Sequence, residues 1–342
     1  MTTKSEGAEG AAEGLTMVEG TAAVRPLLAG RKRRVPVHGV LLLDKTAGIS
    51  SNDALIQAKR LLNAEKAGHT GTLDPFATGL LPLCFGEATK FAQDLLEADK
   101  SYDTTVLLGR TTTTGDTEGE TVDVLPVNVT IAQIEAVLSM FRGPILQTPP
   151  MYSALKRDGK PLYEYARAGI TLEREPRALV IHRLELIDYQ APSLRLRVTC
   201  SKGTYIRVLG EDIGAALGCG AHLQALRRTA VGALHLDDAM TLAALAAIDA
   251  PARAASLAPV DALLASFPIV SLDDVLAHRF MQGQRLSMGK ESLDVVADAC
   301  RVRVYRSSDG CLLGTGRMQA FDVLAPERLV ANTAPNGGTP SC

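Results

Sequence analysis

Residues 68–79, with the sequence GHTGTLDPFATG, form the segment that most constrains how this chain can fold. The segment holds three glycines and one proline around a single carboxylate, Asp74. Glycine loses more conformational freedom on folding than any other residue, and proline cannot donate a hydrogen bond to a helix or a sheet. Such a loop costs stability and needs a compensating use, for which Asp74 is the candidate. A turn-capping aspartate is the structural alternative, since Asx turns are common in such loops.

The residues before this loop predict a strand and then a helix. Residues 40–43 are a short apolar run, which is typical of a buried strand. Ser50, with Asp53 three positions later, predicts a capping box, and we expect the helix to continue to about Asn63. The glycine-rich loop is therefore reached from a strand and a helix.

A second informative stretch combines an alternating pattern with a helical one. Residues 194–200 alternate between apolar and polar side chains, which predicts a strand, and residues 202–204 predict a turn. Residues 208–217 look helical and end before a glycine. This interpretation places Tyr205 and Arg207 at the edge of a sheet.

The C-terminal quarter predicts a separate small β unit. Residues 241–262 are rich in Ala and Leu with two interrupting prolines, which predicts a short helix and a linker, and we expect a boundary near residue 265. Residues 301–305 alternate, residues 307–310 form a turn, and residues 311–314 predict the return strand.

The charge balance and the cysteine pattern argue against several classes of function for this chain. The 342 residues include 36 basic and 38 acidic side chains, and the net charge of −2 argues against indiscriminate nucleic-acid binding. A local basic face is still possible, because residues 151–177 carry six basic and four acidic side chains. The six cysteines form no CxxC pair and no Cys/His cluster, which argues against a disulfide framework or a zinc site. We expect reduced thiols and a cytoplasmic protein.

Both ends of the chain have the composition of tails. Residues 1–35 are rich in Ala, Gly, Glu and Thr and lack the apolar run of a signal peptide, so we expect a disordered tail. Residues 333–342 predict a second disordered end. No uncharged apolar stretch of ~18 residues is present, so we expect no membrane span.

The segment 68–79 closely resembles the nucleophile loop of the TruB family of bacterial tRNA pseudouridine synthases, which isomerise uridine 55 in the T loop of tRNA. The resemblance covers about 36–332 and is strongest over 38–86 and 151–228. It implies an α+β protein with the pseudouridine synthase fold, in which helices flank a mixed, mostly antiparallel central sheet.

The resemblance also implies a domain organisation. The catalytic domain is expected over residues 36–262, with a thumb-like insertion at about 145–178. A small β-rich, PUA-like RNA-binding domain is expected over residues 266–332.

The catalytic roles of the family fall on three residues of this chain. Asp74 matches the nucleophile, and Arg207 matches the arginine that pairs with it, where a guanidinium can hold a carboxylate in two hydrogen bonds and lower its pKa. Tyr102 matches the tyrosine that stacks on the target base and helps to remove the C5 proton. Taken alone, Arg207 is typical of a surface ion pair and Tyr102 of half-buried packing.

Further matches concern substrate binding. His69 corresponds to the histidine that fills the space left by flipped bases of the T loop. Tyr205 and Leu226 match residues that wall the uracil pocket, although both could be core residues. Lys45 matches a lysine near the active-site loops or a phosphate, with a solvated lysine as the alternative.

The thumb-like insertion interleaves aromatic and basic side chains, as RNA-contacting segments do. We expect its cations to affect RNA affinity more than chemistry; they are Lys156, Arg157, Lys160 and Arg167. An amphipathic surface helix would look similar. In the segment 108–116, Thr113 stands where the family usually has an aspartate, while the final Asp116 is kept, so no role is assigned to residue 113.

Pseudouridine formation breaks the N1–C1′ bond and makes a C5–C1′ bond without redox change, so the resemblance implies no cofactor and no metal. The expected partner is the T stem-loop of tRNA, bound by a monomer without an obligatory protein partner. Two alternatives remain: an RNA-guided relative that modifies ribosomal RNA inside a ribonucleoprotein, and a non-catalytic tRNA folding helper. The insertion and the C-terminal unit favour the stand-alone enzyme.

Overall fold

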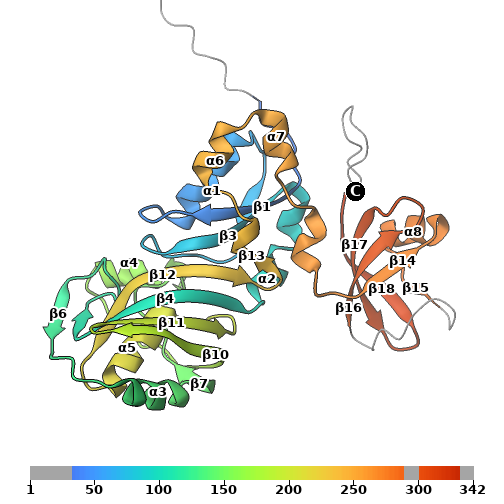
Figure 1. Cartoon of the computed structure of the whole chain (residues 1–342). Coiled ribbons are helices and arrows are strands. Elements are labelled where there is room, and N and C mark those ends of the chain that lie inside the picture. Colours follow the sequence, from blue (N-terminus) through green and yellow to red (C-terminus); the bar gives the residue numbers. More distant parts are fainter. Residues whose placement is uncertain (1–32, 289–299, 332–342) are drawn as a thin grey trace, which may run out of the picture. The chain divides into compact units, whose positions relative to one another are not determined.

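The computed structural model describes residues 33–288 and 300–331 (Figure 1). The predicted tails therefore lie almost entirely outside the described residues. Val35 is the exception, because its amide donates to the Asn63 carbonyl at 2.9 Å and the residue bridges to Ala64. The described residues thus begin slightly before the predicted end of the tail at residue 35.

A nine-stranded mixed sheet forms the body of the larger unit, in the order β1-β3-β12-β4-β11-β10-β7, with β2 paired to β3 and β13 to β12. All of its ladders are antiparallel except the one between β3 and β12. The prediction of a mixed, mostly antiparallel sheet is confirmed. The strands are β1 Gly39–Lys45, β2 Ala67–His69, β3 Thr78–Phe85, β4 Lys100–Leu108, β7 Gly143–Gln147, β10 Arg177–Gln190, β11 Ser193–Cys200, β12 Ala221–Val231 and β13 Leu234–His235.

Helices flank this sheet, and α3 and α5 lie together on one face of it (Figure 1). Strand β4 shows why that face is apolar: Tyr102, Thr104 and Val106 alternate with more exposed residues and point into the core. The helices are α1 Ser51–Leu61, α2 Ala92–Leu96, α3 Ile131–Met140, α4 Leu162–Arg167, α5 Ile206–Ala216, α6 Leu242–Ala247 and α7 Ala250–Ala255, with 3-10 turns η1 Gly86–Lys90, η2 Leu236–Asp238 and η3 Val260–Leu264.

Helix α1 begins as predicted and ends earlier. Ser50 is the N-cap, and its hydroxyl accepts a hydrogen bond from the Asp53 amide at 3.1 Å. Leu62 is the C-cap, and Asn63 adopts a left-handed conformation with φ of 51°. The helix thus ends within two residues of the expected end at about Asn63, because an asparagine tolerates this conformation and turns the chain there.

Helix α5 begins two residues earlier than the predicted start at residue 208. Tyr205 is the N-cap and Arg207 lies in the first helical turn, so the predicted position at a sheet edge is wrong. The buried side chain of Gln147 fixes this start, because it accepts from the Tyr205 amide at 2.8 Å and donates to the Tyr205 carbonyl at 3.1 Å. A contact from a distant strand thus sets the helix boundary.

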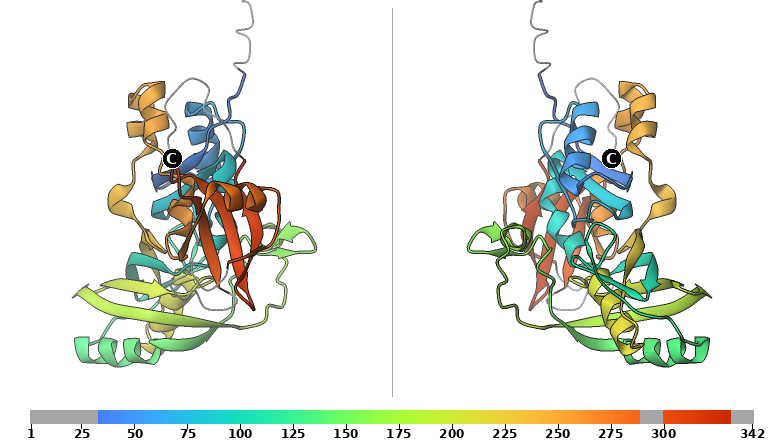
Figure 2. Two further views of the ribbon diagram at one scale, coloured as in Figure 1. Left: turned by 90° about the vertical axis from the view of Figure 1, so that its right-hand side faces the viewer. Right: turned by 90° about the vertical axis from the view of Figure 1, so that its left-hand side faces the viewer.

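Two small hairpins extend from the sheet: β5 Arg110–Thr112 with β6 Thr121–Val124, and β8 Lys156–Arg157 with β9 Lys160–Pro161. Figure 2 shows the β8–β9 hairpin, in green, standing out from the sheet. This hairpin and α4 form the middle of the predicted thumb, which is therefore not one amphipathic helix.

The C-terminal β unit has a five-stranded sheet in the order β14-β16-β17-β18-β15 and one helix, α8. Its own apolar core includes Val270, Phe280, Val304 and Leu324. The predicted β-rich C-terminal unit is confirmed. The elements are β14 Ile269–Leu272, α8 Asp274–Met281, β15 Leu286–Ser287, β16 Arg301–Arg306, β17 Leu312–Gln319 and β18 Val323–Leu329. None of the helices in the described ranges has the length and apolar character needed to cross a bilayer.

Candidate active site

Asp74 lies in the loop between β2 and β3, and the backbone on both sides of it is anchored. The Ser51 hydroxyl donates to the Leu73 carbonyl at 2.9 Å and accepts from the Leu73 amide at 2.8 Å. On the other side, the Lys45 ammonium donates to the Pro75 carbonyl at 3.2 Å. These bonds hold the carboxylate in place, which compensates for the flexibility of a glycine-rich loop.

Arg207 meets Asp74, with its Nε 2.9 Å from Asp74 Oδ2. The arginine side chain is only 4 % exposed, whereas the aspartate side chain is 34 % exposed and reaches the surface of the site. The rest of the guanidinium is used elsewhere, because Nη1 donates to the Thr114 carbonyl at 2.8 Å and Nη2 to the Tyr152 carbonyl at 2.6 Å. The structure thus shows one contact to Asp74 in place of the two-bond fork expected from the sequence. The alternative of a surface ion pair is wrong.

Asp116 is a second carboxylate at the same arginine and, unlike Asp74, is buried; no role was predicted for it. Its Oδ2 lies 3.5 Å from Arg207 Nη1, and its side chain is 3 % exposed. Its Oδ1 accepts from the Thr114 hydroxyl at 2.5 Å and from the Glu118 amide at 3.0 Å. One guanidinium therefore serves two carboxylates. The match of Asp116 to the family pattern was the available signal, whereas Thr113 is exposed.

Burial raises the pKa of Asp74, while Arg207 and Lys45 lower it and Asp116 raises it further. The net direction is upward, opposite to the lowering expected from the arginine alone. The reason is that loss of water around a carboxylate disfavours its charged form, and here this outweighs the ion pair.

The raised pKa of Asp74 predicts that activity falls at an unusually high pH on acidification. This fall is the acid limb of the pH–activity profile. Because Asp74 protonates at a higher pH than a free aspartate, activity that needs the carboxylate is lost on acidification at a higher pH than the ordinary aspartate pKa of about 3.9. Asp116→Asn removes a charge that raises the pKa of Asp74, so the limb is expected to move to lower pH. Single-turnover rates against pH measure this. Asp103→Asn, at an exposed ion pair with Arg197, is the control, and a limb that Asp116→Asn does not move contradicts the prediction.

Lys45 is completely buried, so the alternative of a solvated lysine is wrong. Its ammonium donates to the carbonyls of Thr46 and Ile49 as well as to Pro75, at 3.0, 2.8 and 3.2 Å. Burial lowers its pKa to about 8, an effect that Asp74 opposes. Three carbonyls occupy its three donors, which favours support of the loop of Asp74 over phosphate binding.

The other predicted pocket residues come from three strands and the start of one helix. Tyr102 on β4 and Leu226 on β12 are 8 % and 7 % exposed. Tyr205 is half-buried at the start of α5. His69 on β2 has a buried Nδ1 without a hydrogen-bond partner among the described residues, and burial lowers its pKa, with Arg228 adding to the effect. The lowered pKa favours the neutral imidazole of His69 at neutral pH.

The predicted thumb cations are exposed: Lys156, Arg157, Lys160 and Arg167. Two of them lie over aromatic rings, with Lys160 Nζ 5.0 Å from the ring centre of Tyr165 and Arg167 Cζ 5.3 Å from that of Tyr163. These pairs form an exposed basic and aromatic surface on the thumb.

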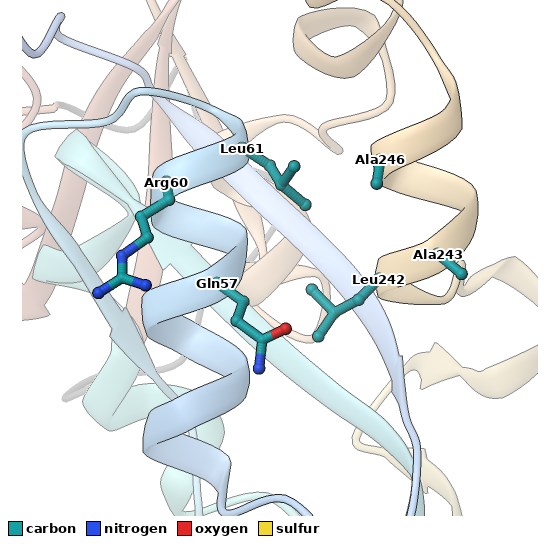
Figure 3. Close-up of a pocket in the computed structure, with 6 residues that line it drawn as sticks. All are labelled: Gln57, Arg60, Leu61, Leu242, Ala243 and Ala246. Atoms are coloured by element: carbon teal, nitrogen blue, oxygen red, sulfur yellow. The ribbon is translucent and has the colours of Figure 1, made fainter. Parts of the chain in front are cut away.

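A hollow of about 400 Å³ lies elsewhere, between α1 and α6 (Figure 3). Its lining is mainly apolar and contains no carboxylate; the residues are Gln57, Arg60, Leu61, Leu242, Ala243 and Ala246. None of the predicted site residues lines it.

Three family models match consecutive parts of the chain. They are "TruB family pseudouridylate synthase (N terminal domain)" over residues 59–206, "tRNA pseudouridylate synthase B C-terminal domain" over 207–265 and "Pseudouridine synthase II TruB, C-terminal" over 268–330. The chain belongs to the TruB family. Its enzyme class, a pseudouridine synthase and therefore an isomerase, is confirmed.

Similar proteins from several bacteria carry the name tRNA pseudouridine synthase B. The protein from Burkholderia lata is 61 % identical over 309 residues, which covers 90 % of this chain and 95 % of that protein. The protein from Cupriavidus taiwanensis is 59 % identical over 309 residues and covers 88 % of this chain and 98 % of its own length.

Solved structures confirm the predicted pseudouridine synthase fold of this TruB family member. A chain in an H/ACA RNP bound to a substrate RNA containing 2′-deoxyuridine has a TM-score of 0.67 at 24 % identity, covering 85 % of this chain and 84 % of that one. A chain in a Cbf5-Nop10-Gar1 complex has a TM-score of 0.66 at 26 % identity with the same coverage.

Proposed function

We propose that this TruB family enzyme isomerises uridine 55 to pseudouridine in the T loop of tRNA, with Asp74 as the nucleophile. The observation that carries the proposal is the contact between Asp74 and the buried Arg207, in a loop whose sequence matches the family motif. The name of the relatives, tRNA pseudouridine synthase B, supports tRNA as the substrate.

The main requirement of the reaction is a carboxylate held in the correct position. The N1–C1′ bond breaks, a C5–C1′ bond forms, C5 loses a proton and N1 gains one, so no electron donor or acceptor takes part. Carboxylates serve at glycosidic carbons as nucleophiles or as stabilisers of positive charge. Arg207 orients Asp74 and opposes the effect of burial on its pKa, which favours the ionised form.

The target uridine must leave its stack to reach Asp74. Tyr102 stacks on the extracted base and assists removal of the C5 proton, and Tyr205 and Leu226 wall the uracil. His69 fills the space that the base leaves in the T loop. The exposed cations of the thumb contact phosphates, so they contribute to affinity and position.

A minimal substrate tests this proposal. The purified chain, acting as a monomer, is expected to release tritium from C5 of labelled uridine 55 in a bare T-arm hairpin. The same hairpin labelled only at another uridine is the control. A requirement for guide RNA and partner proteins would favour the RNA-guided alternative. Binding of the hairpin without tritium release would favour the folding helper.

A further inference from the structure

Arg228 on β12 is among the largest fully buried side chains of the described residues, at 2 % exposure, and the mechanism above does not use it. Its neighbour Arg227 lies near the surface and forms an ion pair, with its Nη2 2.7 Å from Asp44 Oδ2. Arg228 instead points into the protein beneath the nucleophile loop.

The guanidinium of Arg228 contacts three segments of the active site. Its Nε donates to the Leu80 carbonyl of β3 at 2.7 Å, and its Nη2 lies 3.4 Å from the carbonyl of Gly71 in the nucleophile loop. Tyr102 lies directly opposite Arg228 across the β12–β4 ladder, and the two side chains interact electrostatically. Arg228 therefore connects the loop of Asp74 with the predicted stacking residue.

The backbone of Arg228 is also fixed in position, because it pairs with a strand on each side. Arg228 pairs with Tyr102 across the antiparallel β12–β4 ladder and with Gly79 across the parallel β12–β3 ladder. A Cβ at Gly79 would lie 2.3 Å from the Arg228 carbonyl oxygen, and Gly79 has φ of +98°, so only glycine fits. The last glycine of the motif thus allows β12 to approach the end of the nucleophile loop.

The charge of Arg228 has no carboxylate beside it. Within residues 33–288 and 300–331, no ion pair includes Arg228. A buried charge without a counter-ion is costly, and an apolar side chain would pack at lower cost. The acidic group that Arg228 does contact is the phenol of Tyr102.

The charged groups around Tyr102 come from several elements. Arg228 on β12 favours the phenolate, whereas Cys200 on β11 and Asp74 in the loop disfavour it. Burial, the largest effect, raises the pKa of Tyr102 to about 12. Arg228 itself faces Lys45, His69 and Lys100, and its charge lowers the pKa of each.

We propose that Arg228 positions the Tyr102 hydroxyl and stabilises its phenolate, so that Tyr102 accepts the C5 proton during isomerisation. The inference rests on the proposed function and on the role of Tyr102 within it. Tyr102 first loses its proton to solvent. The phenolate oxygen then takes the proton from C5, and the electron pair of the broken C–H bond forms the C5–C6 double bond. The electron pair of the C6–N1 double bond moves to N1, which takes a proton from water, and Tyr102 returns its own proton to water. Arg228 touches neither base nor sugar and is a positioning residue.

The test compares Arg228→Met and Arg228→Lys with Tyr102→Phe. Single-turnover tritium release is measured against pH, and ionisation of Tyr102 is followed by the absorbance of tyrosinate. The chain has seven tyrosines and no tryptophan, so the difference from Tyr102→Phe isolates one residue against a simple background. Arg253→Met is the matched control, because Arg253 also donates to three backbone carbonyls, those of Leu245, Leu61 and Ala246, away from Asp74.

For Arg228→Met we expect the midpoint of Tyr102 ionisation to move to higher pH and the rate at neutral pH to fall about tenfold for each unit of that shift. KM is expected to change little, and Arg228→Lys to keep the midpoint nearer to wild type. If Arg228→Met does not fold, Arg228→Lys decides. Lysine keeps the positive charge but not the geometry of the guanidinium. Arg228→Lys should therefore lower the rate and leave the midpoint of Tyr102 ionisation unchanged.

An unchanged midpoint in Arg228→Met, with a loss of rate no greater than in Arg253→Met, would overturn the proposal and leave a structural role. A midpoint that rises in Arg228→Lys as far as it does in Arg228→Met would overturn it equally, because the retained charge would then have no effect on Tyr102. The proposed function fails by a different result, in which the wild type releases no tritium from the T-arm hairpin.

Discussion

Asp74→Asn is expected to abolish isomerisation while leaving the affinity for tRNA within about tenfold of wild type, or roughly 1.4 kcal/mol. Asparagine keeps the shape of the side chain and still accepts a hydrogen bond from Arg207, but it has no negative charge for the glycosidic centre. The fold is expected to persist, because Arg207 keeps Asp116 and two backbone carbonyls as partners. Tritium release and filter binding of the same tRNA transcript measure the two quantities.

Asp103→Asn is the matched control for this substitution. Asp103 lies on β4, like Tyr102, but its side chain is 40 % exposed and pairs with Arg197 at 2.8 Å. Exposed pairs contribute about 0–1 kcal/mol, so activity and affinity should both remain. Equal loss of binding and isomerisation in Asp74→Asn would contradict the role assigned to Asp74.

Arg207→Met is expected to remove activity and to destabilise the protein by about 3–5 kcal/mol, the usual cost of breaking a buried ion pair. The change leaves the carboxylates of Asp74 and Asp116 facing each other without a cation between them. It also strips the Thr114 and Tyr152 carbonyls of their donor. Urea unfolding measures the stability change, and tritium release measures the activity.

Arg207→Lys is expected to recover little of either property. The guanidinium donates in three directions, to Asp74, to the Thr114 carbonyl and to the Tyr152 carbonyl. A lysine ammonium is a compact charge that cannot span these acceptors. Arg197→Met, which loses an exposed pair, serves as control. Full activity and wild-type stability in Arg207→Lys would show that charge alone matters at this position.

The residues that alternate or match a motif were predictable from the sequence. Strand β11 follows the alternation of residues 194–200, and the meeting of Asp74 with Arg207 follows from the family resemblance. The start of α5 was not predictable, because Tyr205 forms no side-chain cap and the bonds that fix it come from Gln147 on β7.

The direction of the Asp74 pKa shift and the burial of Arg228 also could not be predicted from the sequence. The upward direction of the Asp74 pKa depends on how much protein surrounds the carboxylate, which local spacing does not reveal. Arg228 follows Arg227 in a strand, and adjacent arginines look alike in a sequence, although one is at the surface and the other is buried. Only the packing of β12 between β3 and β4 distinguishes them.

The central position of β12 has a consequence for biosynthesis. The strands that flank it, β3 and β4, leave the ribosome long before residues 221–231 do. The nascent chain therefore exposes two unpaired strand edges and a loop of Asp74 that still lacks the contact from Arg228 to Gly71. Pairings between segments so distant in sequence form slowly. The loop of Asp74 is therefore completed late, and a chain arrested before β12 should be inactive and prone to aggregate through those edges.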